Sequence, residues 1–473
     1  MSLYDSEFSF DDNLFSGDEK EIDAEIERCR KAVEDGNIYT CIETVEDTLQ
    51  ICVDNERHRE GLYLINKLIE VAPYNSDYWV KKGIFQNGLF YFEGAVKSFE
   101  KALSLNPGDS EALIDKAAAE ENLGNYSDAQ ISLQKALSND PNDEEAWFNL
   151  GMVTQRLNDF ETAIDCFNKV IELDSIFVEA YYELGFCYEN LGEYNSSLNA
   201  YDKFLEIEPY SANGWYNRGV VLGKLNNLEK AIESYELAVA VREKFASAWF
   251  NLGNSHADLG KLQQAVECFE KALQFDPEDE AACYNLANIY EELTDLSKAL
   301  IYYSEAIKIN DEYFDAYLAR GFCFDTLGQY QDAMKDFESA IALSGDNADA
   351  WYAKADLEYS IGKLQNAVDS YRRAVTLEPE NFEIWFNLAE TLFELGNWVE
   401  ALEAFENCNL LNPGDATSFY AKAKVNLILS RTRDAVVCLK EAFKLDPSIK
   451  NDFAREYPEI KSSKLFKKLL GEH

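Results

Sequence analysis

The sequence repeats itself every 34 residues from Ile42 to Ile449 without an insertion. Eight of the nine prolines share one position of this repeat, slot 32 if Ile42 is slot 1: Pro73, Pro107, Pro141, Pro209, Pro277, Pro379, Pro413 and Pro447. Because proline cannot continue a helix, this position ends one helix and precedes the next. The pattern predicts twelve copies of one unit, starting at residues 42, 76, 110, 144, 178, 212, 246, 280, 314, 348, 382 and 416.

Other slots predict a pair of closely packed helices in each repeat. Slot 8 is Gly or Ala in eleven repeats, as at Gly151 and Ala287, and slot 20 is Ala in ten. Small side chains at two facing positions allow two helices to approach closely. Slot 15 is often Gly, or Asn as at Asn158 and Asn226, which suits a left-handed helix end. Large apolar residues at helical spacing, such as Trp147, would fill the space between the helices.

The run Ala146-Trp147-Phe148-Asn149-Leu150-Gly151, followed by Ala163, Phe167 and a later proline, resembles the tetratricopeptide repeat (TPR) family. The resemblance covers residues 42–449. It implies an all-α fold, a right-handed superhelix (α-solenoid) of about twelve antiparallel helix pairs with capping helices at both ends. Repeat one departs from the pattern with Leu49 and Gly61 in the small slots.

The chain outside the repeats is short. Residues 19–41 are predicted to form an N-terminal capping helix, and residues 450–473, with Phe453 and Tyr457 among their apolar residues, a C-terminal one, because a solenoid must cover its end repeats. Residues 1–18, which interleave acidic and aromatic residues, are interpreted as a disordered tail. A short docking motif, or a latch lying in the groove, is the alternative for this tail.

The net charge of the chain restricts the class of partner that it can bind. The chain has 87 acidic and 43 basic residues, a formal net charge of −44. Such a surface repels phosphate backbones and anionic lipid, so direct nucleic-acid binding is not expected. A protein or peptide partner that is basic or neutral is favoured. The alternative interpretation is that the acidic charge only keeps a large solenoid in solution.

The remaining sequence signals predict a cytoplasmic protein. No stretch of the sequence has the eighteen apolar residues that membrane insertion would need, and the N-terminus does not resemble a secretory signal. The ten cysteines have no CxxC spacing, and most lie in amphipathic helical patterns. They are interpreted as small buried side chains in a reducing compartment.

Asparagines recur at slot 6, on the first helix of each hairpin, which lines the concave face in TPR proteins. These are Asn149, Asn217, Asn251, Asn285 and Asn387, and slot 9 adds Asn254 and Asn288. An amide both donates and accepts, so a row of amides can pair with an extended peptide backbone. The row is similar to the asparagine ladder in the TPR region of O-GlcNAc transferases. The alternative is that these amides merely decorate the repeat.

Slot 5 is aromatic in eight repeats, with Tyr182, Tyr216, Phe250 and Tyr284 at the centre of the row. Aromatic rows offer contact area at low conformational cost, so we expect them to contribute to peptide binding. The alternative is that these rings pack between repeats. Repeats 212–313 lack the acidic residue found at slot 2 of eight other repeats and carry three successive slot-6 asparagines, so the peptide site is expected there.

The sequence gives little support for a catalytic function. There are three histidines, His58, His256 and His473, and no HExxH, P-loop, GxSxG or zinc-like cysteine spacing, so no catalytic residue, metal ligand or cofactor is expected. The function predicted is a non-catalytic scaffold or adaptor that binds a partner segment in the concave groove. Two alternatives remain: a co-chaperone-like holder of unfolded chains, and a non-catalytic subunit of an enzyme complex. Self-association through end repeats is also left open.

Overall fold

The computed structural model describes residues 18–36 and 38–458. These residues form 26 α-helices, one short 3-10 helix (Ile38–Thr40) and no strand, which confirms the all-α prediction. The chain divides into two compact units, Met1–Glu243 and Lys244–His473, and each is described by itself. Residues 1–17, most of the expected tail, lie outside the described residues.

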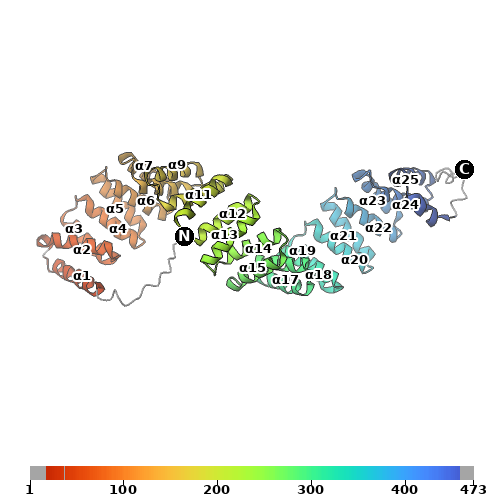
Figure 1. Cartoon of the computed structure of the whole chain (residues 1–473), viewed down its shortest axis with the longest axis horizontal. Helices are drawn as coiled ribbons and strands as arrows, with labels where there is room; N and C mark the ends of the chain where they lie inside the picture. The colour runs from red at the N-terminus through yellow and green to blue at the C-terminus, as the bar shows by residue number, and fades with distance from the viewer. Residues whose placement is uncertain (1–17, 37, 459–473) are drawn as a thin grey trace. The chain divides into compact units, whose positions relative to one another are not determined.

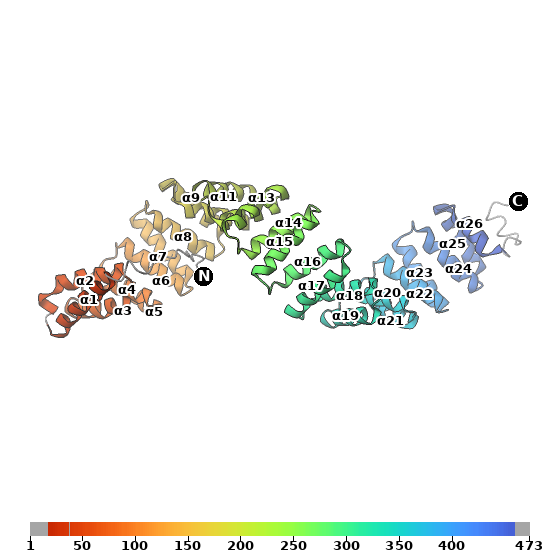
Figure 2. The same cartoon turned by 60° about the horizontal axis from the view of Figure 1, so that its bottom comes forward.

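The first unit begins with α1 and then stacks six helical hairpins, whose helices follow one another in Figure 1 and Figure 2. We call the first helix of each hairpin helix A and the second helix B. The helices are α1 (Asp18–Glu34), α2 (Ile42–Asp54), α3 (His58–Val71), α4 (Ser76–Gly88), α5 (Phe92–Leu105), α6 (Ser110–Asn122), α7 (Tyr126–Asn139), α8 (Glu144–Arg156), α9 (Phe160–Leu173), α10 (Val178–Asn190), α11 (Tyr194–Ile207), α12 (Ala212–Lys224) and α13 (Leu228–Val241).

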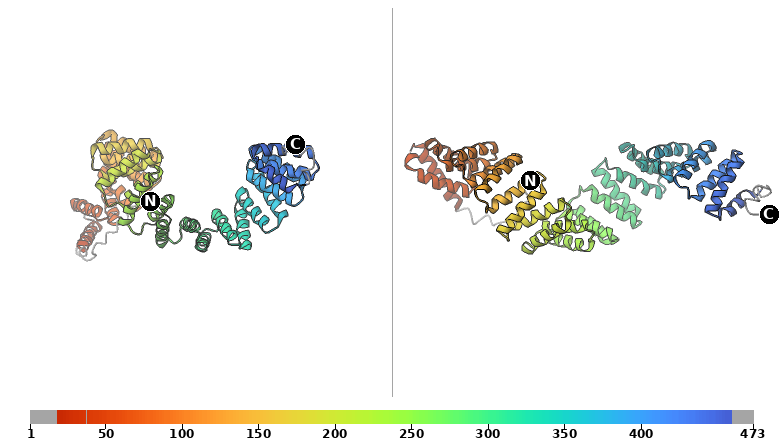
Figure 3. Two further views of the ribbon diagram at one scale, coloured as in Figure 1. Left: turned by 45° about the vertical axis from the view of Figure 1, so that its right-hand side comes forward. Right: turned by 90° about the horizontal axis from the view of Figure 1, so that it is seen from above.

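The described part of the second unit consists of six more hairpins followed by a short helix. Figure 3 shows its ribbon in green to blue. Its helices are α14 (Ala246–Asp258), α15 (Leu262–Phe275), α16 (Glu280–Glu292), α17 (Leu296–Ile309), α18 (Phe314–Thr326), α19 (Tyr330–Leu343), α20 (Ala348–Ser360), α21 (Leu364–Leu377), α22 (Phe382–Glu394), α23 (Trp398–Leu411), α24 (Ala416–Ile428), α25 (Thr432–Leu445) and α26 (Ile449–Glu456).

The small residue at slot 8 lets helix A lie directly against a large ring on helix B. A Cβ atom added at Gly151 would approach Phe167, at slot 24 of the same repeat, to 2.6 Å, and one at Gly253 would approach Phe269 to 3.0 Å. Phe167 and Phe269 are completely buried. In nine of the twelve hairpins the core is therefore a ring on helix B seated on a small residue of helix A, which is the close approach that the sequence predicts, whereas Ile65, Leu133 and Leu439 take the place of the ring in the other three.

Slot 15 has a left-handed backbone in all twelve hairpins, between helix A and helix B. Seven glycines have positive φ, and six of them occupy this slot: Gly124, Gly192, Gly260, Gly328, Gly362 and Gly396. Six other residues adopt the same conformation there: Glu56, Phe90, Asn158, Asn226, Thr294 and Ser430. The turn between the helices requires this conformation even where the side chain disfavours it, so composition alone does not identify the slot in every repeat.

A hydrogen bond joins two recurring positions of the repeat, the tryptophan at slot 4 and the residue at slot 32. The slot-4 indole of one repeat donates to the backbone carbonyl of the preceding slot 32, as from Trp147 Nε1 to Pro141 O at 2.9 Å and from Trp385 Nε1 to Pro379 O at 2.9 Å. The tryptophan thereby anchors the loop that connects consecutive repeats, and the bond satisfies its polar N–H.

Helices outside the hairpins cover the first and last repeats. Ile26, Cys29 and Val33 of α1 are buried in one cluster with Val45 and Leu49 of α2. At the other end, the Phe453 ring of α26 is buried 5.9 Å from that of Phe443 in α25. The cap predicted for residues 450–473 is described only as far as residue 458.

Candidate peptide-binding surface

All the residues predicted to bind a peptide lie on A helices and are half-buried. Phe148 and Asn149 are on α8, Tyr182 on α10, and Tyr216 and Asn217 on α12, all in the first unit. The second unit holds the remaining residues: Phe250, Asn251 and Asn254 on α14, Tyr284, Asn285 and Asn288 on α16, and Asn387 on α22. The segment 212–313 expected to bind the peptide is divided between the two units, so each part is considered separately.

The slot-5 rings pack mainly inside their own hairpins. Their centroids lie 5.7 Å from the slot-24 ring in the case of Phe250 and Phe269, and 5.7 Å for Tyr284 and Tyr303. In the first unit the corresponding separations are 5.8 Å for Tyr182 and Tyr201, and 6.0 Å for Tyr216 and Tyr235. One side of each ring is thus occupied by helix B. These four contacts each lie within one hairpin and not between repeats, which was the alternative to peptide binding considered from the sequence.

Amides of the second unit form hydrogen bonds between successive repeats. Asn285 donates through Nδ2 to Oδ1 of Asn254 at 2.9 Å, and Asn387 donates to the Tyr352 hydroxyl at 2.9 Å. Asn288 accepts from the Tyr303 hydroxyl at 2.6 Å. The first two bonds join slots 6 and 9 or slots 5 and 6 of consecutive A helices, whereas the bond between Asn288 and Tyr303 joins helix A to helix B within one hairpin. They use part of the hydrogen-bonding capacity that a peptide backbone would need.

The first unit contains one bond of the same kind and one amide that differs. Asn217 donates to the Tyr182 hydroxyl at 2.9 Å. Asn149 has no such bond to the preceding repeat, which offers Ile114 and Ala118 at slots 5 and 9 without a polar side chain, and it lines a cavity instead. The same slot-6 asparagine therefore braces two repeats or faces open space, depending on its neighbour.

The cavity beside Asn149 lies between α8 and α10 and has a volume of about 680 Å3. Its apolar side consists of Phe148, Met152 and Phe177, with the two phenyl centroids 5.0 Å apart. Phe177 occupies slot 34, the N-cap of α10, and makes no side-chain cap bond there. At the same slot Asp143 caps α8 by accepting from the Ala146 amide. The aromatic residue at this cap gives up a stabilising hydrogen bond and supplies a cavity wall.

Carboxylates form the rest of the lining: Glu144, Glu145, Glu179 and Glu183. Burial raises the pKa of Glu183, while a hydrogen bond from Gln155 and the positive charge of Arg156 act in the opposite direction. On the neighbouring α6, burial raises the pKa of Asp115 to about 7, and the negative charges of Glu111 and Glu145 add to the rise. This surface holds acidic groups in an environment that disfavours their charge.

Basic residues at slot 7 were not singled out from the sequence, yet six repeats carry one there: Lys82, Lys116, Arg218, Arg320, Lys354 and Lys422. Arg218 pairs with Asp202 at 2.6 Å and Arg320 with Asp336 at 2.7 Å. These partly buried ion pairs join helix A to a helix B of the same or the preceding repeat. The recurrence of Lys or Arg at one slot was the signal that could have identified them.

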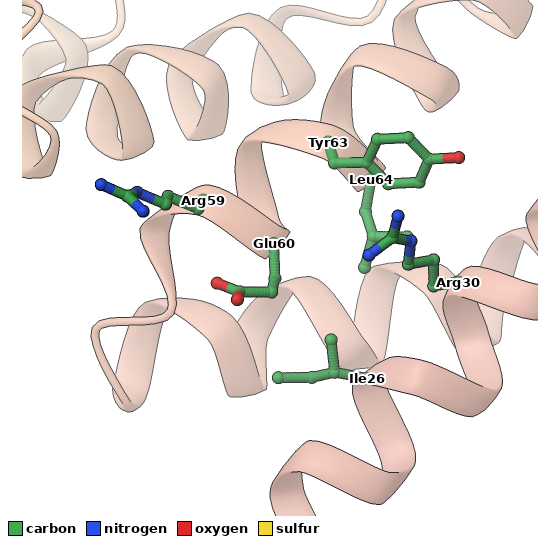
Figure 4. A pocket seen from close by; sticks show the side chains of 6 residues that line it. All are labelled: Ile26, Arg30, Arg59, Glu60, Tyr63 and Leu64. Atoms are coloured by element: carbon green, nitrogen blue, oxygen red, sulfur yellow. The ribbon is translucent and has the colours of Figure 1, made fainter.

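A second cavity, of about 200 Å3, lies between α1 and α3 and is shown in Figure 4. It is lined by Ile26, Arg30, Arg59, Glu60, Tyr63 and Leu64. The Arg30 guanidinium lies 5.2 Å from the centroid of the Tyr63 ring and pairs with Glu34 at 3.0 Å. The lining of this cavity has two basic residues and one acidic residue, whereas the cavity between α8 and α10 has four acidic residues and no basic one.

Thiols of the described chain do not have the character of nucleophiles. Nine of the ten cysteines are buried. Burial raises the pKa of Cys166 to about 12 and that of Cys408 to about 12, so both thiols remain protonated at neutral pH. Within residues 18–36 and 38–458, no group of three or more His, Cys, Asp and Glu side chains is placed to hold a metal ion.

Models of the tetratricopeptide repeat match the chain in successive segments. They match residues 92–150, 144–176, 178–211, 212–245, 246–279, 280–313, 314–347 and 382–415, and a further model described as a TPR repeat matches 355–396. The chain belongs to the TPR family. The resemblance found in the sequence is thereby confirmed, and TPR repeats are in general non-catalytic scaffolds for protein interaction.

Several solved structures are similar to this TPR protein. YrrB, described as a TPR protein with an unusual peptide-binding site, is 26% identical, with a TM-score of 0.36, over 38% of this chain and 94% of that chain. The Cut9–Hcn1 complex is 16% identical, with a TM-score of 0.36, over 84% and 92%. A TPR protein from Cytophaga hutchinsonii is 17% identical, with a TM-score of 0.47, over 51% and 99%.

A comparison with curated proteins and an examination of the helices both give a negative result. Among the curated proteins, none matches the TPR chain. Among the helices that the structure describes, none combines the length and the apolar character that crossing a bilayer requires.

Proposed function

We propose that this TPR protein is a non-catalytic scaffold that binds a segment of a basic or neutral partner protein along its A helices. The observation that carries the proposal is the open cavity between α8 and α10, where aromatic and acidic side chains from consecutive repeats converge. Rigid aromatic side chains supply contact area, and carboxylates supply attraction for a cationic partner. The net charge of −44 favours the same class of partner at longer range.

The hydrogen-bonded amides of the second unit support a structural contribution to binding, whereas the sequence predicted that these amides would pair directly with a peptide backbone. Asn285 and Asn254 are bonded to each other, and Asn387 is bonded to Tyr352. We propose that these amides hold neighbouring repeats in register and present their remaining oxygen and N–H groups to a partner backbone. Asn149, whose amide has no hydrogen-bond partner among the described residues, is the asparagine best available for direct contact.

The proposal is tested by capturing partners of the tagged full-length protein from its native lysate at low and high salt. A basic partner should be retained in stoichiometric amount at low salt and released at high salt, since charges more than about 10 Å apart are screened at 0.1 M. A second column should carry the protein with Glu145→Gln and Glu179→Gln as a comparison. These two substitutions leave the helix-B surface unchanged. Equal retention of the same partner at both salts and on both columns would contradict the acidic surface as the binding site.

A holder of unfolded chains is the second candidate, favoured by exposed aromatic side chains in the turns between helices of the first unit. Tyr74, Phe90 and Tyr210 are 81%, 79% and 84% exposed. Such side chains contact many sequences without selecting one. The same capture experiment separates the two functions, because a holder would retain many unrelated polypeptides with little dependence on salt.

A further inference from the structure

The cavity between α8 and α10 combines two chemistries that one kind of side chain can satisfy together. Phe148, Met152 and Phe177 form its apolar side, and Glu144, Glu145, Glu179 and Glu183 supply the carboxylates. Its lining contains no lysine or arginine, and Arg156, whose charge acts on Glu183, does not line it. The carboxylates therefore have no basic neighbour inside the cavity.

The apolar side suits an aliphatic chain ending in a positive charge. The Phe148 and Phe177 rings, 5.0 Å apart and inclined by 37°, give two surfaces over which methylene groups can pack. Met152 completes this side with a flexible thioether. Phenyl faces also attract a cation that comes within about 6 Å of their centroids. An acidic side chain would be repelled there, and a short polar one would not reach from the ring surfaces to the carboxylates.

We propose that this cavity binds the side chain of a lysine or arginine from an extended segment of a partner protein. The methylene stem packs against Phe148, Phe177 and Met152, and the ammonium or guanidinium group pairs with the carboxylates of Glu145, Glu179 and Glu183. The inference rests on the proposed function and deepens it, because it assigns the partner's basic residue to one cavity of the first unit. Binding pairs a carboxylate, Glu183, that the fold already keeps partly away from water.

The corresponding slots of α14 and α16 in the second unit explain why we assign the basic side chain to the cavity of the first unit. In α14 and α16, slots 1 and 2 hold Ala246, Ser247, Glu280 and Ala281, and slot 6 holds asparagine in both helices. Asn285 and Asn254 are bonded to each other across the two helices. This surface has one carboxylate at the slots where the first unit has four, so a cationic side chain gains little there.

Methionine NMR gives a local test. The chain has three methionines, Met1, Met152 and Met334, of which Met152 lines the cavity and Met334 is half-buried on α19 of the second unit. The full-length protein would be labelled with 13C at the methionine methyl groups, and Met152→Leu would assign the resonance. The probe is a nine-residue Gly/Ser peptide with one central lysine, compared with the same peptide carrying arginine, acetyl-lysine or norleucine.

The lysine or arginine peptide should shift the Met152 resonance in a saturable manner and leave Met334 unchanged. Acetyl-lysine and norleucine peptides should bind at least about tenfold more weakly, because they lose the charge pairing. Equal shifts from lysine and norleucine peptides, or no shift of Met152 at millimolar peptide, would overturn the inference. A peptide of residues 459–473, which contains four lysines, tests whether the chain's own terminus is the occupant; tighter binding of it than of the Gly/Ser lysine peptide would overturn the assignment to a partner.

Substitutions that remove charge without removing bulk test whether the carboxylates of the cavity bind the peptide. Glu145→Gln, Glu179→Gln and Glu183→Gln together should reduce lysine-peptide affinity by at least about tenfold. The matched control, Glu161→Gln with Asp165→Asn and Glu233→Gln, removes the same charge from exposed positions on helices α9 and α13 and should retain the affinity. Equal losses from the two triple variants would show general electrostatics and overturn the site.

Phe177→Ser removes one wall of the cavity with little threat to folding, because Ser211 at the same slot caps α12 by accepting from the Gly214 amide. It should weaken lysine-peptide binding while keeping the helical content of the protein; unchanged binding would overturn the role of the apolar wall. The two proposals fail in different ways. If the Gln triple variant captures the partner as well as the unchanged protein does, and the Met152 resonance does not shift with the lysine peptide, this inference alone is refuted. If the lysine peptide binds but no partner is captured, the proposed function is refuted.

Discussion

Two regions of the molecule use the same slots for different purposes. The acidic segment, helices α6, α8 and α10 of the first unit, places Asp115, Asn149 and Glu183 at slot 6. The amide segment, helices α14 and α16 of the second unit, places Asn251 and Asn285 there. In the amide segment the slot-6 side chain of α16 is bonded to the preceding helix, whereas in the acidic segment Asn149 and Glu183 line an open cavity.

The difference shows that the function of a slot depends on the neighbouring repeat. Asn285 contacts Asn254 on the preceding A helix, whereas the A helix before Asn149 offers Ile114 and Ala118 at slots 5 and 9. Both segments share the same framework, in which a small slot-8 residue meets a buried side chain at slot 24, a ring in every hairpin of the two segments except that of α6, where it is Leu133. The framework therefore tolerates very different residues at slots 6 and 9, because its contacts between slots 8 and 24 do not involve those positions.

The largest expected effect tests the shared framework. Phe167→Ala and Phe269→Ala each remove a completely buried ring, so each should lower the free energy of unfolding of its hairpin by about 3–5 kcal/mol. Urea unfolding combined with hydrogen exchange of α8–α9 and α14–α15 measures both. A cost below about 1 kcal/mol in only one segment would show that the frameworks are not equivalent.

The next effect concerns pH and should appear only in the acidic segment. The pKa of Asp115 is raised from 3.8 to about 7, so between these values the folded chain keeps a proton that the unfolded chain releases. Stability should therefore fall as pH rises through this window, with the loss complete above pH 7. Asp115→Asn should stabilise the first unit at pH 8 by about 1–2 kcal/mol, a value reduced to allow for partial exposure, and hardly at pH 3.

Hydrogen exchange of α6–α8 at the two pH values is the measurement for Asp115→Asn. Helices α14–α16 serve as the internal control, because their slot-6 residues, Asn251 and Asn285, do not titrate. Equal stabilisation by the substitution at both pH values would contradict the raised pKa.

A smaller effect distinguishes the bonded amide from the open one. Asn285→Ala leaves Asn254 Oδ1 without its donor and should cost about 1 kcal/mol, whereas Asn149→Ala should change stability by less than about 0.5 kcal/mol. Denaturant unfolding of the Asn254→Ala and Asn285→Ala single and double variants should give a coupling of about 0.5–1.5 kcal/mol. Independent, additive losses would argue against the bond.

The smallest effect is expected at slot 15, where Asn158 and Gly260 adopt the same left-handed backbone. Asn158→Gly and Gly260→Asn should each change stability by only a few tenths of a kcal/mol, because asparagine tolerates this conformation. Gly260→Val is the control and should cost more than about 1 kcal/mol, since a branched side chain is strained there. Thermal unfolding of the three variants would show whether the turn is equally demanding in both segments.

Much of the fold was predictable from the period because each marker has a local cause. Proline at slot 32, tryptophan at slot 4 and the small residue at slot 8 act within one hairpin or its immediate neighbour, so their spacing along the chain already encodes the contact. Slot 15 was predicted only where glycine or asparagine revealed it; Phe90 and Thr294 adopt the same backbone without a sequence signal.

The candidate site was less predictable because it depends on pairs of side chains from different repeats. The sequence located the slot-5 and slot-6 residues but favoured the segment 212–313, where the two amides at 254 and 285 are bonded to each other. The cavity beside Asn149 needs Phe177 from a cap position and Glu179 from the next repeat, and no single slot reveals that combination.

The sequence by itself determined the hairpin, its period and the all-α class, since short-range sterics and helix-breaking residues act between neighbours in the chain. Tertiary structure alone decided which polar side chains are consumed inside the protein and which remain open. The physical reason is that a hydrogen bond or a desolvated carboxylate depends on distances of a few ångströms between consecutive A helices. Asn149 and Asn285 share one slot, and they are distinguished by the side chains that the preceding A helix brings against each amide.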